Sequence, residues 1–239
     1  MVHILFRAKH ILIGIKAALP VCLGYIPVGL AFGVLAAQAG LLVQEVFFMS
    51  LLVYAGSAQF ISISMIAAGA SVGTIITTTF LVNARHILMS ASLAVHLKKY
   101  SNKLLALIGF GITDETYAVA ISDLTRQERE PAYFLGLNLT SQAVWIASTV
   151  IGASVGNIIP DPSVWGLHFA LPGMFIGLLV IQMKERLSIV IALVAFSLSL
   201  TIKIIVHGNW HVVVASVITA TIGVIIEKWI AKSSQSSSA

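Results

Sequence analysis

The sequence predicts an all-α integral membrane protein, a polytopic bundle of about seven or eight transmembrane helices, some of them broken or re-entrant. Hydrophobic residues make up 58% of the 239 positions, and the mean hydropathy is +0.99. Charged residues make up 10%, against about 25% in a typical soluble domain. Apolar stretches long enough to cross a bilayer cover most of the chain. These observations exclude an ordinary soluble enzyme, a disordered chain and a disulfide scaffold.

Eight stretches have the length and composition of a membrane span, which needs about 20 mostly apolar residues. They are 11–37, 46–68, 75–97, 104–121, 132–155, 165–183, 187–206 and 210–230. No remaining segment is large enough to fold as a separate soluble domain, so we expect a single integral membrane domain over residues 1–232. The polar, Ser-rich segment 233–239 is expected to be a disordered tail.

The positions of Lys and Arg predict the orientation. Basic residues concentrate in five places: before residue 11, at 98–103, at 126–129, at 184–186 and after residue 227. Because basic loops stay on the cytoplasmic side of a membrane, we expect both termini in the cytoplasm. These loops account for the net charge of +5, so we expect no nucleic-acid partner. Eight full spans would put 98–103 on the wrong side. We therefore expect either 75–97 or 104–121 to be broken or re-entrant.

Motifs for metal or nucleotide chemistry are missing. Cys22 is the only cysteine, so an intrachain disulfide is excluded and we expect neither a metal site nor a cofactor. The sequence has no GxxxxGK[ST] loop and no HExxH pair, and it predicts no enzyme activity. Transport by this chain would have to use an ion gradient, the gradient of the substrate or a partner protein.

Helix breakers interrupt four of the apolar stretches, at Pro20 to Gly33, at 54–59, at 109–115 and at 168–173. Inside lipid, a break survives where it is buried in protein or lines a cavity. In the second stretch, Gly56 disfavours a helix and Ser57 is a good N-cap for a half-helix that runs to about residue 68. Its N-terminus would suit an anion such as an amino-acid carboxylate. The alternative is that these small residues allow close helix packing.

Polar residues occur near the middle of two further stretches. The third stretch carries Asn83, Arg85 and His86, and a cation at the bilayer centre costs at least about 2.5–3.5 kcal/mol. Arg85 must therefore face protein or water. Asp114 and Glu115 are the acids that lie well inside an apolar stretch, and such a pair favours proton coupling. The alternative is an Arg85 ion pair with one of these acids that locks helices together.

Four segments resemble motifs of the AzlC/YgaZ family, in the same order and with similar spacing. They are 24–33 (GYIPVGLAFG), 49–60 (MSLLVYAGSAQF), 83–90 (NARHILMS) and 113–117 (TDETY). The combination of VYAGSAQF with NARH is the specific part of the likeness. The resemblance covers most of the chain, and the second half matches chiefly in hydropathy.

The resemblance implies the large subunit of a branched-chain amino-acid exporter in the bacterial cytoplasmic membrane. The implied substrates are valine, leucine and isoleucine, with methionine in some members. The implied partners are a small membrane subunit of the AzlD/YgaH type, the amino-acid substrate and the lipid bilayer.

We combine both arguments into one hypothesis for the site. The substrate-binding residues are expected to be Tyr54, Gly56, Ser57, Gln59, Asn83 and Thr113. Ser57 and nearby backbone amides would hold the carboxylate, and an acid would receive the ammonium. Apolar side chains around Met49, Phe60 and Met89 would accept the branched tail.

Proton coupling is expected from a second set of residues: Asp114, Glu115, Arg85 and His86. Two rival functions stay open. In the first, the chain would be an uncoupled channel or facilitator. In the second, it would be an assembly subunit whose partner forms the pathway.

Overall fold

The structure is a computed structural model that describes residues 2–159 and 186–205, with isolated residues between 164 and 180 and between 218 and 226. All regular secondary structure in these residues is helical, which confirms the predicted class. The chain divides into two compact units, Met1–Phe175 and Ile176–Ala239. The candidate site lies in the first.

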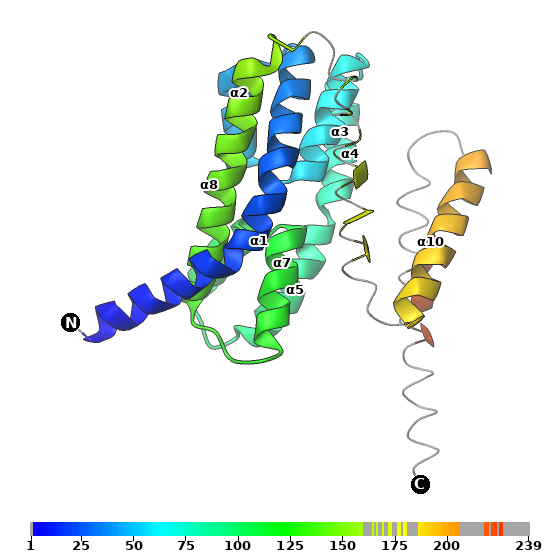
Figure 1. The fold of residues 1–239 in the computed structure, drawn as a ribbon. Coiled ribbons are helices and arrows are strands. Elements are labelled where there is room, and N and C mark those ends of the chain that lie inside the picture. The colour runs from blue at the N-terminus through cyan, green and yellow to red at the C-terminus, as the bar shows by residue number, and fades with distance from the viewer. Residues whose placement is uncertain are drawn as a thin grey trace. The chain divides into compact units, whose positions relative to one another are not determined.

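The helices of the first unit are α1 (Val2–Gln38), α2 (Val43–Leu52), α3 (Gly56–Ala67), α4 (Val72–Asn83), α5 (Arg85–His96), α6 (Asn102–Phe110), α7 (Asp114–Leu124) and α8 (Pro131–Gly156), drawn in Figure 1. In the second unit, α10 (Arg186–Ile205) matches the stretch expected at 187–206. The stretches 165–183 and 210–230 lie largely outside the described residues, and the segment 233–239 lies entirely outside them. The total number of spans and the single domain over 1–232 stay predictions.

Two long helices, α1 and α8, run side by side and in parallel through the first unit (Figure 1). Gly14 lies against the backbone of Tyr133, and Gly33 lies against the backbone of Thr149. Residues later in α1 contact residues later in α8, so the two helices run in the same direction. Small residues let two helix backbones approach this closely, as is common inside membranes.

The helix α1 is continuous, so the expected break in the first stretch is wrong. Pro20 and Pro27 both lie inside α1, which changes direction along its length (Figure 1). Proline is tolerated inside a membrane helix because neighbouring groups satisfy the backbone carbonyls that it frees. The prolines therefore bend this helix instead of ending it.

The stretch 46–68 folds into a hairpin, with α2 and α3 as its arms. The arms are joined by Gln59, whose Nε2 donates to Ser50 Oγ at 3.1 Å. Against the upper halves of the long helices, the Phe60 ring packs edge-on to Phe32 at 5.3 Å, and Ser50 Oγ lies 2.8 Å from Thr149 Oγ1. A helix of ten residues is about 15 Å long, half the hydrocarbon thickness of a bilayer. Each arm of the hairpin is therefore too short to cross a bilayer alone, and the chain turns back between the two arms.

A second hairpin, made of α6 and α7, enters from the opposite end. Asn138 Nδ2 donates to the carbonyl of Ile108 at 3.0 Å, which ties the end of α6 to the first third of α8. The loops before α6 and after α7 are joined by Lys99 and Glu128, whose charged atoms are 2.6 Å apart. The hydrogen bond from Lys99 lowers the pKa of the Glu128 carboxyl. The start of α6 and the end of α7 therefore lie at the same end of the unit.

The stretch 75–97 crosses the unit as two helices, α4 and α5, with a turn at Ala84 between them. Taken together as Val72–His96, they are one of three described segments long and apolar enough to cross a membrane. The other two are Ala8–Gln38 and Pro131–Gly156. Both stretches suspected of a break, 75–97 and 104–121, are interrupted, and 46–68 and 104–121 do not form single spanning helices.

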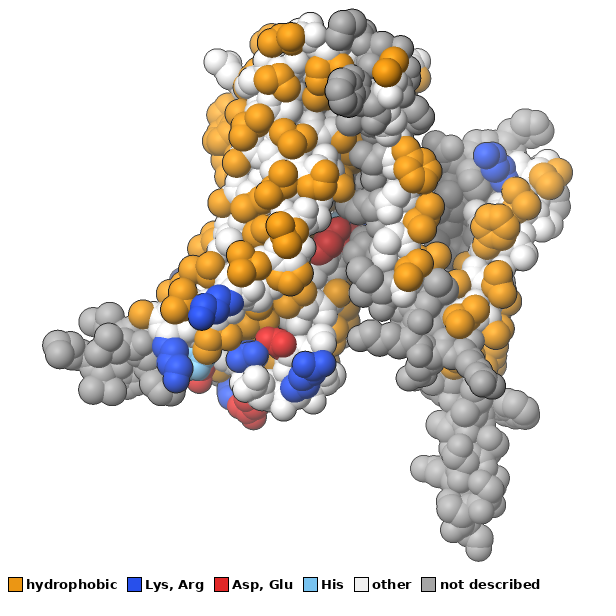
Figure 2. Space-filling view, in the orientation of Figure 1, with side chains coloured by type: hydrophobic (Ala, Val, Ile, Leu, Met, Phe, Trp, Pro, Cys, Tyr) orange, Lys and Arg blue, Asp and Glu red, His pale blue; other side chains and the backbone are white. Residues whose placement is uncertain are grey.

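This arrangement removes the conflict with the charge rule. The loops at 97–101 and 125–130 and the start of α1 lie at the same end of the unit (Figure 1). Lys, Arg, Asp and Glu side chains gather at that end in Figure 2, while the helix sides are hydrophobic. Lys98, Lys99 and Lys103 therefore lie on the same side as Arg126 and Arg129, as positively charged loops should.

Candidate functional site

A pocket forms where the tips of the two hairpins meet the turn between α4 and α5. Its lining residues come from five segments: 54–57, Arg85 with His86, 113–115, Tyr25 of α1 and Trp145 of α8. The N-termini of α3, α5 and α7 all face this pocket, since each helix begins at a lining residue. Helix N-termini carry partial positive charge. The pocket therefore combines donors and partial positive charge with two carboxylates.

Arg85 connects the two hairpin tips. Its Nη1 lies 2.8 Å from Asp114 Oδ2 at the start of α7, and its Nη2 donates to Ser57 Oγ at the start of α3. The ion pair that the sequence left open is therefore made with Asp114. Removing one partner of a partly buried ion pair leaves an uncompensated charge, which is strongly destabilising. Arg85 thus fixes the distance between the tips.

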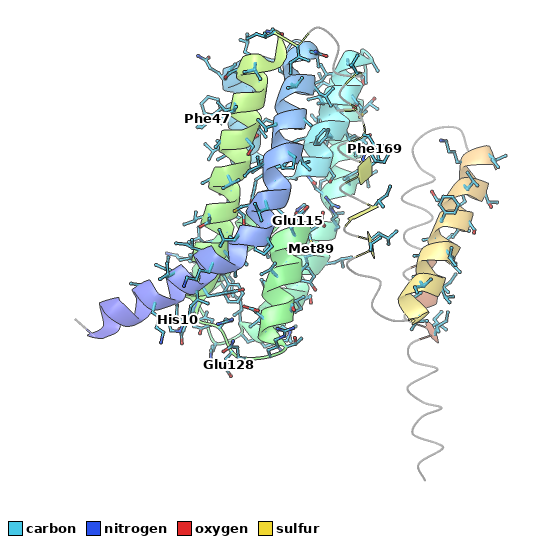
Figure 3. All side chains as sticks on the ribbon, viewed as in Figure 1. His10, Phe47, Met89, Glu115, Glu128 and Phe169 are labelled. Carbon is cyan, nitrogen blue, oxygen red and sulfur yellow. The ribbon has the colours of Figure 1, made fainter. Side chains whose placement is uncertain are left out.

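The second acid, Glu115, is held by a tyrosine from α1. Tyr25 Oη donates to Glu115 Oε2 at 2.8 Å and lies 2.6 Å from Thr113 Oγ1. Within the described residues no Lys, Arg or His forms an ion pair with Glu115. Glu115 lies midway along the unit, far from Glu128 in the end loop (Figure 3). The two neighbouring acids therefore have different partners.

The start of α7 is capped, whereas the start of α3 is not. Thr113 Oγ1 accepts a hydrogen bond from the backbone amide of Thr116 at 3.3 Å, and the backbone amide of Thr113 donates to Thr116 Oγ1 at 2.8 Å, which together make a capping box. The residue before α3 is Ala55, which makes no side-chain cap. The first amides of a helix have no partner inside the helix. Those of α3 therefore remain available to an acceptor in the pocket.

The turn between α2 and α3 is held in an uncommon conformation. Tyr54 has φ +42°, a left-handed value that costs free energy for a residue with a side chain. Its hydroxyl is buried and makes no hydrogen bond of standard geometry to the described residues. A Cβ on Gly56 would lie 3.1 Å from the Trp145 ring. The turn is thus packed tightly against α8 and presents Tyr54 to the pocket.

The pocket is closed down in this conformation. A water molecule's centre can move through about 10 Å³ inside it, which is room for about one water.

Several predicted residues lie elsewhere or act differently. Ser57 does not cap α3, because this helix begins at Gly56, before Ser57. The Ser57 hydroxyl instead accepts a hydrogen bond from Arg85. Gln59 is fully buried and bonds Ser50 and Trp145, so it stabilises the hairpin outside the pocket. Asn83 is not among the lining residues; its carbonyl lies 3.1 Å from His86 Nδ1.

The expected apolar contact surface is also different. Phe60 and Met49 pack in one hydrophobic core cluster, Met89 packs against another, and none of them lines the pocket. The Trp145 ring lines the pocket with an apolar surface. Trp145 and Tyr25 were not among the predicted site residues. Tyr25 lies inside the 24–33 motif, so that motif was its available signal; Trp145 carried none beyond its place in an apolar stretch.

The comparison with known proteins bears on this pocket directly. The sequence model of the family described as AzlC protein matches residues 20–159. This match covers more than half of the chain and includes every residue that lines the pocket. The chain belongs to the AzlC family. The resemblance of the four sequence motifs is thereby confirmed.

Relatives of this AzlC-family chain come from distant organisms. It is 35% identical to the inner membrane protein YgaZ of Escherichia coli, over 76% of this chain and 77% of that protein. It is 32% identical to an uncharacterized membrane protein of Archaeoglobus fulgidus, over 77% and 81%. It is 24% identical to the branched-chain amino acid transport protein AzlC of Bacillus subtilis, over 82% and 77%. No solved structure matches the chain. With its apolar helices and membrane-protein relatives, this AzlC-family chain is a membrane protein.

Proposed function

We propose that this chain exports branched-chain amino acids across the bacterial cytoplasmic membrane, coupled to protons, as the large subunit of a two-component permease. The observation that carries the proposal is the pocket at which two half-length hairpins meet from opposite ends of the unit. Transporters bind substrate and ions at such broken helices near the membrane midplane. The name of the Bacillus subtilis relative supplies the substrate class.

The chemistry of the pocket suits a small zwitterion. The α3 amides, Ser57 and Arg85 provide donors for a carboxylate, and Asp114 and Glu115 provide acceptors for an ammonium group. The Trp145 ring provides an apolar surface for a branched tail. In a water-poor site these groups bind more strongly than they would in water. Glu115 and Asp114 are the groups that would exchange a proton with the medium.

Efflux of labelled valine from membrane vesicles tests the proposal. Vesicles would contain the chain alone, the chain with a small AzlD/YgaH-type subunit, or the small subunit alone. Each preparation is assayed with and without an imposed pH gradient. We expect valine efflux that needs both subunits and stops when the gradient is collapsed. Efflux that continues unchanged without the gradient would support the uncoupled facilitator instead.

A matched pair of acids tests proton coupling. Glu115→Gln removes an acid from the pocket, and Glu128→Gln removes an acid from the exposed loop at 125–130. We expect Glu115→Gln to lose gradient-driven efflux and Glu128→Gln to keep the wild-type rate. Equal, wild-type rates in both variants would exclude Glu115 as a coupling group.

Two observations favour a second candidate function, an assembly subunit. The Arg85–Asp114 ion pair and the small free volume are also what a helix-locking network would have. Under this alternative the small subunit alone moves valine in the vesicle assay. Dependence of efflux on Trp145 and Glu115 of this chain would argue against it.

A further inference from the structure

We infer that Arg85 binds the substrate carboxylate and that Asp114 is an internal carboxylate that occupies Arg85 until the substrate displaces it. This inference rests on the proposed function, because it assigns the two ends of the substrate within the same pocket. It separates the roles of two adjacent acids, Asp114 and Glu115.

The geometry of Arg85 carries the inference. Its two Nη atoms contact Asp114 and Ser57, which belong to different hairpins. A guanidinium is a planar fork that matches a carboxylate and stays charged in proteins. Asp114 therefore already shows Arg85 binding the chemical group that an amino acid would bring. A substrate carboxylate competes for the same atoms.

The start of α3 provides a place for the incoming carboxylate beside Arg85. The first-turn amides of α3 follow Ala55, which offers no side-chain oxygen to them. The α3 amides begin beside Ser57, which Arg85 contacts, and an anion there would satisfy them.

Glu115 is the acid that fits the ammonium group. Tyr25 donates to it at 2.8 Å, and no basic side chain of the described residues forms an ion pair with it. The substrate would thus extend from Arg85 and the start of α3 to Glu115, leaving Asp114 displaced.

The exchange of carboxylates also accounts for opening of the closed pocket. Arg85 holds the tip of α2–α3 to the tip of α6–α7 through Ser57 and Asp114. When a substrate carboxylate takes the place of Asp114, this link between the tips is broken. Binding and separation of the tips are therefore one event.

Calorimetric titration of the full-length chain with leucine tests the assignment. We expect Arg85→Gln to weaken leucine binding by about tenfold or more, since hydrogen bonds to charged groups contribute about 1.5–3 kcal/mol. We expect Asp114→Asn to strengthen leucine binding by about threefold or more, since a competing carboxylate is removed. Misfolding cannot produce the second result. Weaker binding in Asp114→Asn would overturn the inference.

The chain offers matched controls at a distant ion pair. Arg129 and Asp123 are 2.6 Å apart and partly buried outside the pocket. Arg129→Gln and Asp123→Asn therefore remove the same chemical groups, and we expect both to bind leucine as the wild type does. Equal changes at both ion pairs would show a general effect of charge and would overturn the assignment.

A decarboxylated analogue separates binding from structure. 3-Methylbutylamine keeps the tail and ammonium of leucine but has no carboxylate. We expect the wild type to prefer leucine by about tenfold or more and Arg85→Gln to lose that preference. An unchanged preference in Arg85→Gln would refute the role of Arg85. If the wild-type chain binds none of valine, leucine and isoleucine, with or without the small subunit, the proposed function itself fails and this assignment fails with it.

Discussion

Gly33 lies at a close approach of the backbones of α1 and α8. A Cβ at this position would meet the carbonyl oxygen of Thr149 at 2.1 Å and the amide of Ala153 at 2.5 Å. Backbone atoms cannot move aside as a flexible side chain can. The absence of a side chain at Gly33, as at Gly14, therefore helps the two helices that carry Tyr25 and Trp145 to pack together.

Two alanine substitutions within α1 test this contact. Gly33→Ala should destabilise the protein by about 1–3 kcal/mol, the usual cost of overpacking. Gly24→Ala, where a Cβ meets nothing within 4 Å, should be neutral or stabilising by up to about 1 kcal/mol. Thermal unfolding in detergent measures both, and an equally stable Gly33→Ala variant would contradict the packing described.

At the scale of single helices, the half-length elements are what place charged groups in the pocket. α7 begins at Asp114 directly after its cap, Thr113, so that the cap residue and two acids share one turn. The capping box satisfies amides that would otherwise be unpaired in an apolar environment. The same cap therefore stabilises the break and orients both acids.

Substitution of two cap residues distinguishes these roles. Thr113→Ala and Ser71→Ala each remove a cap whose side chain accepts from a first-turn amide. Each should cost about 0.5–2 kcal/mol of stability. We expect Thr113→Ala alone to lower valine efflux, because Ser71 lies at the start of α4 away from the pocket. Unchanged efflux in Thr113→Ala would exclude a positioning role for this cap.

At the scale of the chain, the first unit predicts a definite membrane topology. Both hairpins turn back, so α1, the α4–α5 pair and α8 are the crossings among residues 2–159. Segments 97–101 and 125–130 then share one side of the membrane, and segments 39–42 and 68–71 share the other. Five complete crossings would instead alternate these four loops.

Single cysteines in a Cys22→Ser background test this topology. A membrane-impermeant maleimide should label Gln44→Cys and Ser71→Cys from one side, and Lys98→Cys and Gln127→Cys from the other. All four side chains are exposed at the described surface. Labelling of positions 44 and 71 from opposite sides would show that 46–68 crosses the membrane and would contradict the hairpin.

Much of this protein follows from its sequence. Hydropathy alone determines an all-helical membrane protein, because lipid leaves the backbone few other ways to satisfy its hydrogen bonds. The sequence also located the break at 54–59 and the partnership of Arg85 with an acid, because a helix breaker or an ion inside an apolar stretch has few stable environments.

The tertiary structure decided the rest. Hydropathy records that a stretch is apolar but not whether it crosses or turns back, so 46–68 was predicted as a span, and the choice between 75–97 and 104–121 as the re-entrant stretch stayed open. Proline content did not reveal that α1 is continuous, since that depends on neighbouring helices. Residues 25, 57, 85, 114 and 145 converge through contacts far apart in the sequence, which no local pattern encodes. The choice of Asp114 over Glu115 as partner of Arg85 is set by which side of α7 each acid occupies.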